Sequence, residues 1–167
     1  MGTNHMGRQS IRFPQPPVVR GFASVAGKKE REGPLGDQFT ATVQDTTFGE
    51  KSWERAERRM QQMTLELALE KAGLTDADLD AAFAGDLLNQ CIGSSFSLRN
   101  RGVPTLGLYG ACSTMAESLL LAAMSVSGGY ARTALAMTSS HFASSERQYR
   151  FPLGYGGQRT PTSQWTV

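Results

Sequence analysis

The chain has 167 residues, a length that suits one domain, and 40% of them are hydrophobic, enough to build a single core. Its formal net charge of +2 is small and its basic residues are not clustered with aromatic residues, which argues against a nucleic-acid partner. No apolar stretch approaches the roughly 18 residues that a membrane span needs. Two cysteines without a signal-like opening segment favour a reducing, intracellular compartment over a disulfide framework.

The opening segment, residues 1–6, resembles a cloning remnant ahead of a second start, and we exclude it from the predicted domain together with His5. That leaves His141 as the histidine available for chemistry. The apolar run over 18–25 predicts a first strand. The charged, glycine-bracketed segment 27–36 predicts a surface loop.

The clearest helix is predicted from Ser52 to Ala72. Ser52 is a good N-cap, and Gly73 stands where a helix stop belongs. Apolar residues three or four apart predict one buried stripe along this helix, and they are Trp53, Ala56, Met60, Met63 and Leu67. The capping-box spacing over 75–78 indicates a short helical turn.

Short apolar runs alternate with helical patterns along the rest of the chain. Strands are predicted near 81–84, 104–109 and 132–139, and a brief helix over 94–101. This alternation predicts an α/β fold with a mainly parallel sheet, against which the helix over 52–72 packs. The stretch 139–162, rich in aromatic residues, arginine and glycine, predicts a long loop of the kind that is often functional.

The centre of the chain is the stretch from Thr105 to Met124. It predicts a buried strand, a tight turn that carries Cys112, and a buried helix. Free N–H groups at the start of that helix favour a thiolate over a thiol. The alternative is that Cys112 is simply a small residue that fits a crowded turn. We expect no disulfide between Cys91 and Cys112.

Particular segments carry a family resemblance. The turn Gly110-Ala-Cys-Ser-Thr114 is similar to the nucleophile turn of thiolase-like condensing enzymes. The further segments are Glu32-Gly-Pro-Leu-Gly36, Ala84-Gly-Asp-Leu-Leu-Asn-Gln90, Thr138-Ser-Ser-His141, Arg150-Phe-Pro152 and Tyr155-Gly-Gly-Gln158. Together they resemble the stage V sporulation protein AD family of spore-forming bacteria, over nearly the whole chain.

The resemblance implies a fold, a function and a set of partners. It implies that residues 7–167 form a thiolase-like N-terminal half, layered α/β/α with helices on both faces, which stops before its last strand and lacks the second half. Family members are linked to the uptake of dipicolinic acid into the forespore and to germination. They act with other stage V sporulation membrane proteins. The resemblance therefore implies a homodimer in the forespore or spore, peripheral to the inner spore membrane.

The resemblance also implies a ligand site for dipicolinic acid (pyridine-2,6-dicarboxylate), with or without calcium. The N–H groups near Cys112 are expected to meet one carboxylate, and Arg150 or Arg147 the other. The expected ligand-binding residues are Asp86, Leu87, Asn89, Cys112, His141, Arg150, Tyr155 and Gly156, and we expect no cofactor and no metal ligands.

Two other functions stay open at this point. One is an acyl-transfer or condensing enzyme with Cys112 as nucleophile, although in such enzymes the partner residues belong to the missing second half. The other is a structural dimer module.

Overall fold

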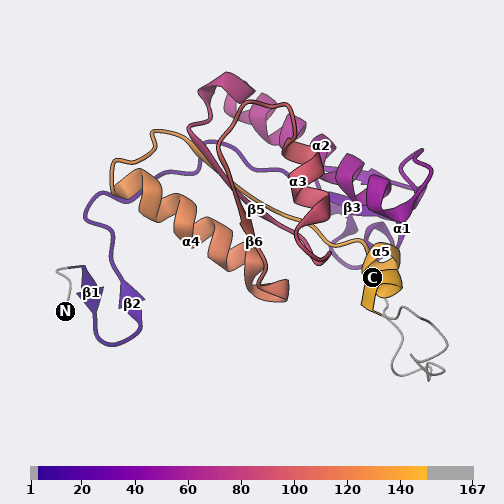
Figure 1. Cartoon of the computed structure of the whole chain (residues 1–167), viewed down its shortest axis with the longest axis horizontal. Coiled ribbons are helices and arrows are strands. Elements are labelled where there is room, and N and C mark those ends of the chain that lie inside the picture. The colour runs from indigo at the N-terminus through magenta and orange to yellow at the C-terminus, as the bar shows by residue number, and fades with distance from the viewer. Residues whose placement is uncertain (1–3, 150–167) are drawn as a thin grey trace.

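A parallel sheet of three strands forms the centre of the chain. A computed structural model describes residues 4–149 (Figure 1). Within them, β5 (Ala81–Gly85) lies between β6 (Thr105–Leu108) and β7 (Ala134–Thr138), in the order β6-β5-β7. Both pairs are parallel, with Phe83 opposite Leu106 on one side and Ala136 on the other. The predicted α/β fold is confirmed.

Helices cover both faces of this sheet. Helix α4 (Thr114–Ser127) lies on one face, whereas α2 (Trp53–Ala72) and α3 (Ile92–Leu98) lie on the other (Figure 1). The core forms where α2, α3 and the three strands meet, and it includes Leu65, Leu79, Ala82, Ala84, Leu98, Val103 and Met137. Because the parallel strands are joined through helices, their carboxyl ends meet at one edge of the sheet.

Helix α2 begins and ends as its sequence predicts. The Ser52 hydroxyl accepts a hydrogen bond from the Arg55 N–H, and Gly73 has the left-handed backbone of a helix stop, with φ of 66°. The capping box predicted over 75–78 is also present, at the 3-10 turn Asp76–Asp78.

The predicted stripe along α2 is only partly right. Ala56 is buried, but Trp53, Met60, Met63 and Leu67 are half-buried. The buried row along the helix is instead Glu57, Gln61 and Leu65, spaced by four residues. Two of its three members are polar, which an apolar pattern does not reveal.

The strand predicted over 18–25 is absent from most of that range. Only its last residue belongs to a strand, β3 (Val25–Gly27), which pairs in parallel with β4 (Ala41–Val43) in a separate small sheet. Residues 18–24 form no strand, and Gly21 and Phe22 lie against the end of α2 instead: a Cβ on Gly21 would lie 2.7 Å from the Ala68 carbonyl oxygen, and Lys71 Nζ lies 5.3 Å from the centroid of the Phe22 ring. The loop predicted over 27–36 contains one short helix, α1 (Lys28–Arg31).

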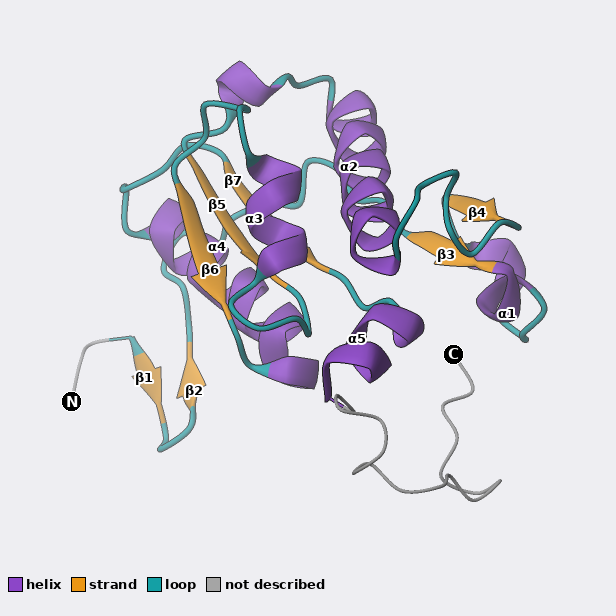
Figure 2. Ribbon diagram, turned by 45° about the vertical axis from the view of Figure 1, so that its right-hand side comes forward, coloured by secondary structure: helices purple, strands orange, loops and turns teal. Residues whose placement is uncertain are grey.

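The chain start and helix α3 also differ from the predictions. His5–Met6 (β1) pairs antiparallel with Ser10–Ile11 (β2) in an exposed hairpin (Figure 2). Helix α3 starts two residues before, and ends three residues before, the predicted 94–101.

The prediction of a buried strand and a buried helix around Cys112 is wrong for the strand and only partly right for the helix. Strand β6 is an edge of the sheet and is largely exposed, because no described strand lies beyond it. Helix α4 buries a row of small residues, Thr114, Ser118 and Ala122, against the sheet. Its larger apolar side chains face outward, namely Met115, Leu119, Leu120 and Met124.

The long loop predicted over 139–162 is also corrected. A helix, α5 (Phe142–Tyr149), follows the end of β7 after three residues and packs against α2 (Figure 2). The remainder of that stretch, from Arg150 onward, lies outside the described residues. The polar sequence of α5 hides its buried side, which among the side chains that the structure describes includes Ser144 and Ser145.

Candidate functional site

Three predicted site segments follow the carboxyl ends of the three parallel strands. Asp86 comes directly after β5, the Cys112 turn follows β6, and Ser139 comes directly after β7. The Ser139 N–H donates to the Gly85 carbonyl oxygen over 3.2 Å, which holds the ends of β5 and β7 together. In open parallel sheets, ligands bind at this edge.

The Cys112 turn is a strained connection between β6 and α4. Ala111 has φ of 51°, a left-handed conformation that costs free energy for a residue with a Cβ. Cys112 lies next to it in a 3-10 turn, Ala111–Ser113, and is exposed. Helix α4 starts at Thr114, two residues later, and not at Cys112 itself.

A carboxylate already occupies the start of α4. The Ser113 hydroxyl lies 2.5 Å from Glu117 Oε1 and 2.7 Å from the Gly110 carbonyl oxygen. Glu117 therefore places negative charge in the first turn of the helix, where the macrodipole stabilises anions. An anionic ligand at the Cys112 turn would meet this charge.

Asp86 is buried and acts as the centre of its own loop. Its Oδ2 accepts hydrogen bonds from both the N–H and the hydroxyl of Ser94, each over 2.7 Å, and its Oδ1 accepts from the Leu88 N–H over 2.9 Å. Only 1% of Asp86 is exposed. Its carboxylate positions the loop 86–91 and the start of α3 and does not face solvent.

The other residues of this loop lie closer to the surface. Asn89 is exposed, and its side-chain oxygen accepts from the Gln90 N–H over 3.1 Å. The Leu87 carbonyl accepts from the Tyr109 hydroxyl over 3.4 Å, which connects the loop to the residue after β6. The loop 86–91 and the Cys112 turn are thus neighbours at one edge of the sheet.

His141 does not face the Cys112 turn. Its Nε2 lies 2.8 Å from the Thr46 carbonyl oxygen, and its ring packs between Trp53 and Phe142, with centroid distances of 5.5 and 5.7 Å. The side chain is 6% exposed, and Nδ1 has no hydrogen-bond partner among the described residues. In the described part of the chain, His141 ties the start of α5 to the loop before α2.

A cluster of buried polar side chains that sequence reasoning missed lies beneath this edge. Glu57 and Gln61 of α2 contact the serines that follow β7 and begin α5, and the serines of α3. The members are Glu57, Gln61, Ser94, Ser97, Ser139 and Ser144. The four-residue spacing of Glu57 and Gln61, in line with Leu65, is the signal that could have found it.

Three further predicted site residues belong to the part of the chain after residue 149. Arg150, Tyr155 and Gly156 are outside the described residues, and so is any part they take in the site. Between residues 4 and 149, no three histidine, cysteine, aspartate or glutamate side chains are grouped as a metal site would require.

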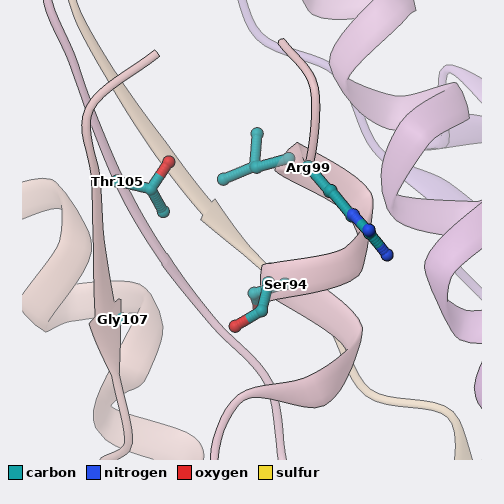
Figure 3. Close-up of a pocket in the computed structure, with 6 residues that line it drawn as sticks. Ser94, Arg99, Thr105 and Gly107 are labelled. Carbon is teal, nitrogen blue, oxygen red and sulfur yellow. The ribbon is translucent and has the colours of Figure 1, made fainter. Parts of the chain in front are cut away.

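The structure also contains a pocket of about 310 Å³ between α3 and the open edge of β6 (Figure 3). Thr105 and Ser94 lie on its two sides, while the Arg99 side chain extends away from β6. The predicted site residues do not line it. Because it follows the exposed strand edge rather than the Cys112 turn, it is distinct from the candidate site.

Comparison with known proteins settles the family. Residues 7–167 match the family model described as Stage V sporulation protein AD. The chain belongs to the stage V sporulation protein AD family. It is 44% identical, over 161 residues, to the stage V sporulation protein AD of Bacillus subtilis (strain 168). The match covers 96% of this chain and 48% of that relative, so the chain spans about half the relative's length.

The site of this family member can be stated from the described residues. It combines an exposed thiol, a strained turn, an exposed amide at Asn89 and two buried carboxyl groups beneath.

No helix among residues 4–149 has both the length and the apolar composition that crossing a bilayer requires.

Proposed function

We propose that the chain is part of a sporulation protein that binds dipicolinic acid and assists its uptake into the forespore, with a further role in germination. The observation that carries this proposal is the family match over residues 7–167. The geometry supports it in one respect. The loop 86–91, in which Asn89 and Gln90 are exposed, and the exposed Cys112 turn lie side by side at the carboxyl edge of a parallel sheet, where ligands bind in many such sheets.

The chemistry of the ligand defines what each segment contributes. Dipicolinate is a flat dianion, so it needs N–H donors or cations for its carboxylates and an apolar wall for its ring. Asn89 supplies an exposed side-chain amide, and the positive end of the α4 macrodipole lies at the Cys112 turn. Arg150, with Tyr155 and Gly156, is proposed to complete the site.

Titration calorimetry with dipicolinate, with and without calcium, tests the proposal. The matched variants are Asn89→Ala and Arg150→Ala, which remove a donor and a cation. We expect saturable binding that each variant weakens, while thermal unfolding stays unchanged for the exposed Asn89 site. Absence of binding, both by this chain and by a chain extended to the full length of its relatives, would refute the proposal.

The exposed Cys112 thiol favours a second candidate, an acyl-transfer enzyme with Cys112 as nucleophile. A strained residue directly before an exposed thiol at a helix start is the arrangement that nucleophiles often have. Stoichiometric acylation by an acyl-coenzyme A, lost in Cys112→Ser, would support this candidate. Saturable dipicolinate binding without acylation would favour the first.

The proposed function includes assembly. We infer a homodimer formed through β6, because this strand is an exposed sheet edge with an apolar residue, Leu106, 48% exposed. Other stage V sporulation proteins in the membrane are the proposed partners, and the inner spore membrane the proposed location. Light scattering of the wild type and of Leu106→Lys tests the dimer, since the lysine should yield monomers.

A further inference from the structure

Glu57 lies in the buried cluster and contacts Ser144. The two short contacts of the Ser144 hydroxyl need one more proton than they would have if Glu57 were ionised. Ser144 Oγ lies 2.6 Å from Glu57 Oε2 and 2.9 Å from the His141 carbonyl oxygen. A serine hydroxyl has one proton and can donate one strong hydrogen bond. If Glu57 were ionised, one of these two short contacts would join two acceptors.

Elsewhere in the cluster, the Ser97 hydroxyl lies 2.5 Å from Gln61 Oε1 and 2.9 Å from the Ser94 carbonyl oxygen, so that two neutral acceptors share its one proton. The hydrogen bonds of the other members each have their own donor. Gln61 has two amide protons, which it donates to Ser139 Oγ over 2.6 Å and to Ser94 Oγ over 3.2 Å. Ser139 then donates to Glu57 Oε1 over 2.7 Å. On the opposite side, Ser94 donates to Asp86, whose carboxylate accepts three hydrogen bonds. Glu57 thus accepts one hydrogen bond from a donor that has no other acceptor, whereas Asp86 accepts three hydrogen bonds.

The charges around Glu57 are negative. Glu54 on α2 and Asp86 after β5 both repel a negative charge at Glu57. Arg58, the next residue along α2, directs its guanidinium to Glu50, with 3.6 Å between Nη2 and Oε1. Among the described side chains that follow β7 and begin α5, the neutral hydroxyls of Ser139 and Ser144 contact Glu57, and the His141 ring contacts Thr46 instead.

Burial of Glu57 also favours the uncharged form of its carboxyl group. Glu57 is 0% exposed, and burial raises the pKa of its carboxyl group, an effect that its hydrogen bonds with Ser144 and Ser139 offset in part. The negative charges of Asp86 and Glu54 raise this pKa further.

We propose that Glu57 is a carboxylic acid in the folded chain and a proton-dependent clasp between α2 and α5. Its Oε2–H donates to Ser144 Oγ, Ser144 donates to the His141 carbonyl oxygen, and Oε1 accepts from Ser139. Every short contact of Glu57 and Ser144 then contains one proton. Ionisation releases that proton to solvent, leaves two buried negative charges near each other and frees the start of α5. The clasp operates whether or not the chain binds dipicolinate.

The sign of the pH dependence follows from the raised pKa. Below the ordinary glutamate pKa, 4.5, Glu57 is protonated in both the folded and the unfolded chain, and the stabilisation is complete. As the pH rises toward the folded pKa, the unfolded chain loses its proton first, so stability falls. Within that window the unfolding equilibrium constant increases about tenfold per pH unit because of this one group.

The decisive variant is Glu57→Gln, which keeps both hydrogen bonds but cannot ionise. Urea unfolding of the wild type and the variant should be compared from about pH 5 to pH 9. We expect the wild type to lose stability relative to Glu57→Gln as the pH rises. The matched control is Glu70→Gln, an exposed glutamate on the same helix, which should remain parallel to the wild type.

Two direct measurements complete the test. Infrared spectra of glutamate-labelled protein at about pH 6 should contain a carboxylic acid band that Glu57→Gln lacks. Amide hydrogen exchange of α5, corrected for intrinsic rates, should become faster with rising pH in the wild type alone. Parallel pH dependence of wild type and Glu57→Gln, absence of the acid band, or failure of Glu57→Gln to fold would overturn the proposal.

Discussion

The N–H and the hydroxyl of Ser94 both donate to the same oxygen of Asp86, each over 2.7 Å. This pair joins the end of β5 to the start of α3, eight residues further along the chain. A third donor, the Leu88 N–H, fixes the loop between them. The loop 86–91 is therefore held in place from the protein interior by Asp86, a residue that the sequence analysis assigned to ligand binding.

Asp86→Asn should destabilise the chain by about 2 to 4 kcal/mol, because the amide group would turn a donor toward one of the three buried N–H or O–H groups. Urea unfolding at neutral pH measures this loss. The control is Asn89→Ala in the same loop, an exposed position where we expect a change of about 0.5 kcal/mol or less. Equal effects of the two substitutions would contradict the supporting role of Asp86.

Gly85→Ala should prevent stable folding or cost about 3 kcal/mol or more. A Cβ at Gly85 would lie 2.2 Å from the Leu108 carbonyl oxygen and 2.5 Å from Thr114 Cγ2, so β5, β6 and α4 cannot all keep their places. Gly27→Ala is the matched control, since a Cβ there meets nothing within 4 Å and its φ of −82° suits alanine. Thermal unfolding of both variants checks the difference.

The two cysteines should react with a thiol reagent at very different rates. Cys112 is exposed, whereas Cys91 is buried with its Sγ 3.2 Å from the Leu108 carbonyl oxygen. Burial raises the pKa of the Cys91 thiol, and the nearby Asp86 charge raises it further. We expect one rapidly labelled thiol per native chain and two after denaturation without reductant. Cys112→Ser should abolish the rapid phase, and a slow wild type would refute the assignment.

Asp80→Asn should reduce the loss of stability in acid. Asp80 Oδ2 accepts from the N–H groups of Arg132 and Thr133, and these hydrogen bonds hold the pKa of Asp80 below its ordinary 3.8. A lowered folded pKa stabilises the chain above about pH 4, and this contribution disappears as the pH falls through the folded pKa. Urea unfolding at pH values on both sides of this window measures it, and an unchanged acid slope in the variant would contradict it.

Glu117→Gln should strengthen dipicolinate binding about two- to fivefold, provided that a ligand carboxylate lies at the start of α4. The substitution removes the negative charge that Ser113 holds in the first helical turn. Calorimetry at low and high salt measures the effect, which salt should diminish. Unchanged affinity would place the ligand carboxylates elsewhere.

The sequence predicts those parts of the fold that depend on local chemistry. Ser52 and Gly73 delimit α2 correctly because a cap and a left-handed stop act on their immediate neighbours. It fails where tertiary contacts decide: residues 18–24 have a strand-like composition but form no strand, and β6 is apolar although it is an exposed edge.

The sequence predicts which segments are neighbours at the sheet edge, but not what their side chains contact. Cys112 and the loop 86–91 do lie together at the carboxyl edge of the sheet, as strand order implies. The buried roles of Asp86 and His141 could not be foreseen, because their partners Ser94 and Thr46 belong to other segments, and a polar residue has no periodic signal that reveals its burial.

The row Glu57, Gln61 and Leu65 along α2 changes from polar to apolar over two helical turns. The carboxyl group of Glu57 therefore has hydrogen-bond partners only beside the serines, and the Leu65 side chain packs well only in the core. If α2 slid by one turn in one direction, Gln61 would enter the apolar core with its amide unpaired. If α2 slid by one turn in the other direction, Leu65 would face the hydroxyl groups and leave them unpaired. The row therefore fixes the position of α2 along its axis, which a uniformly apolar stripe cannot do.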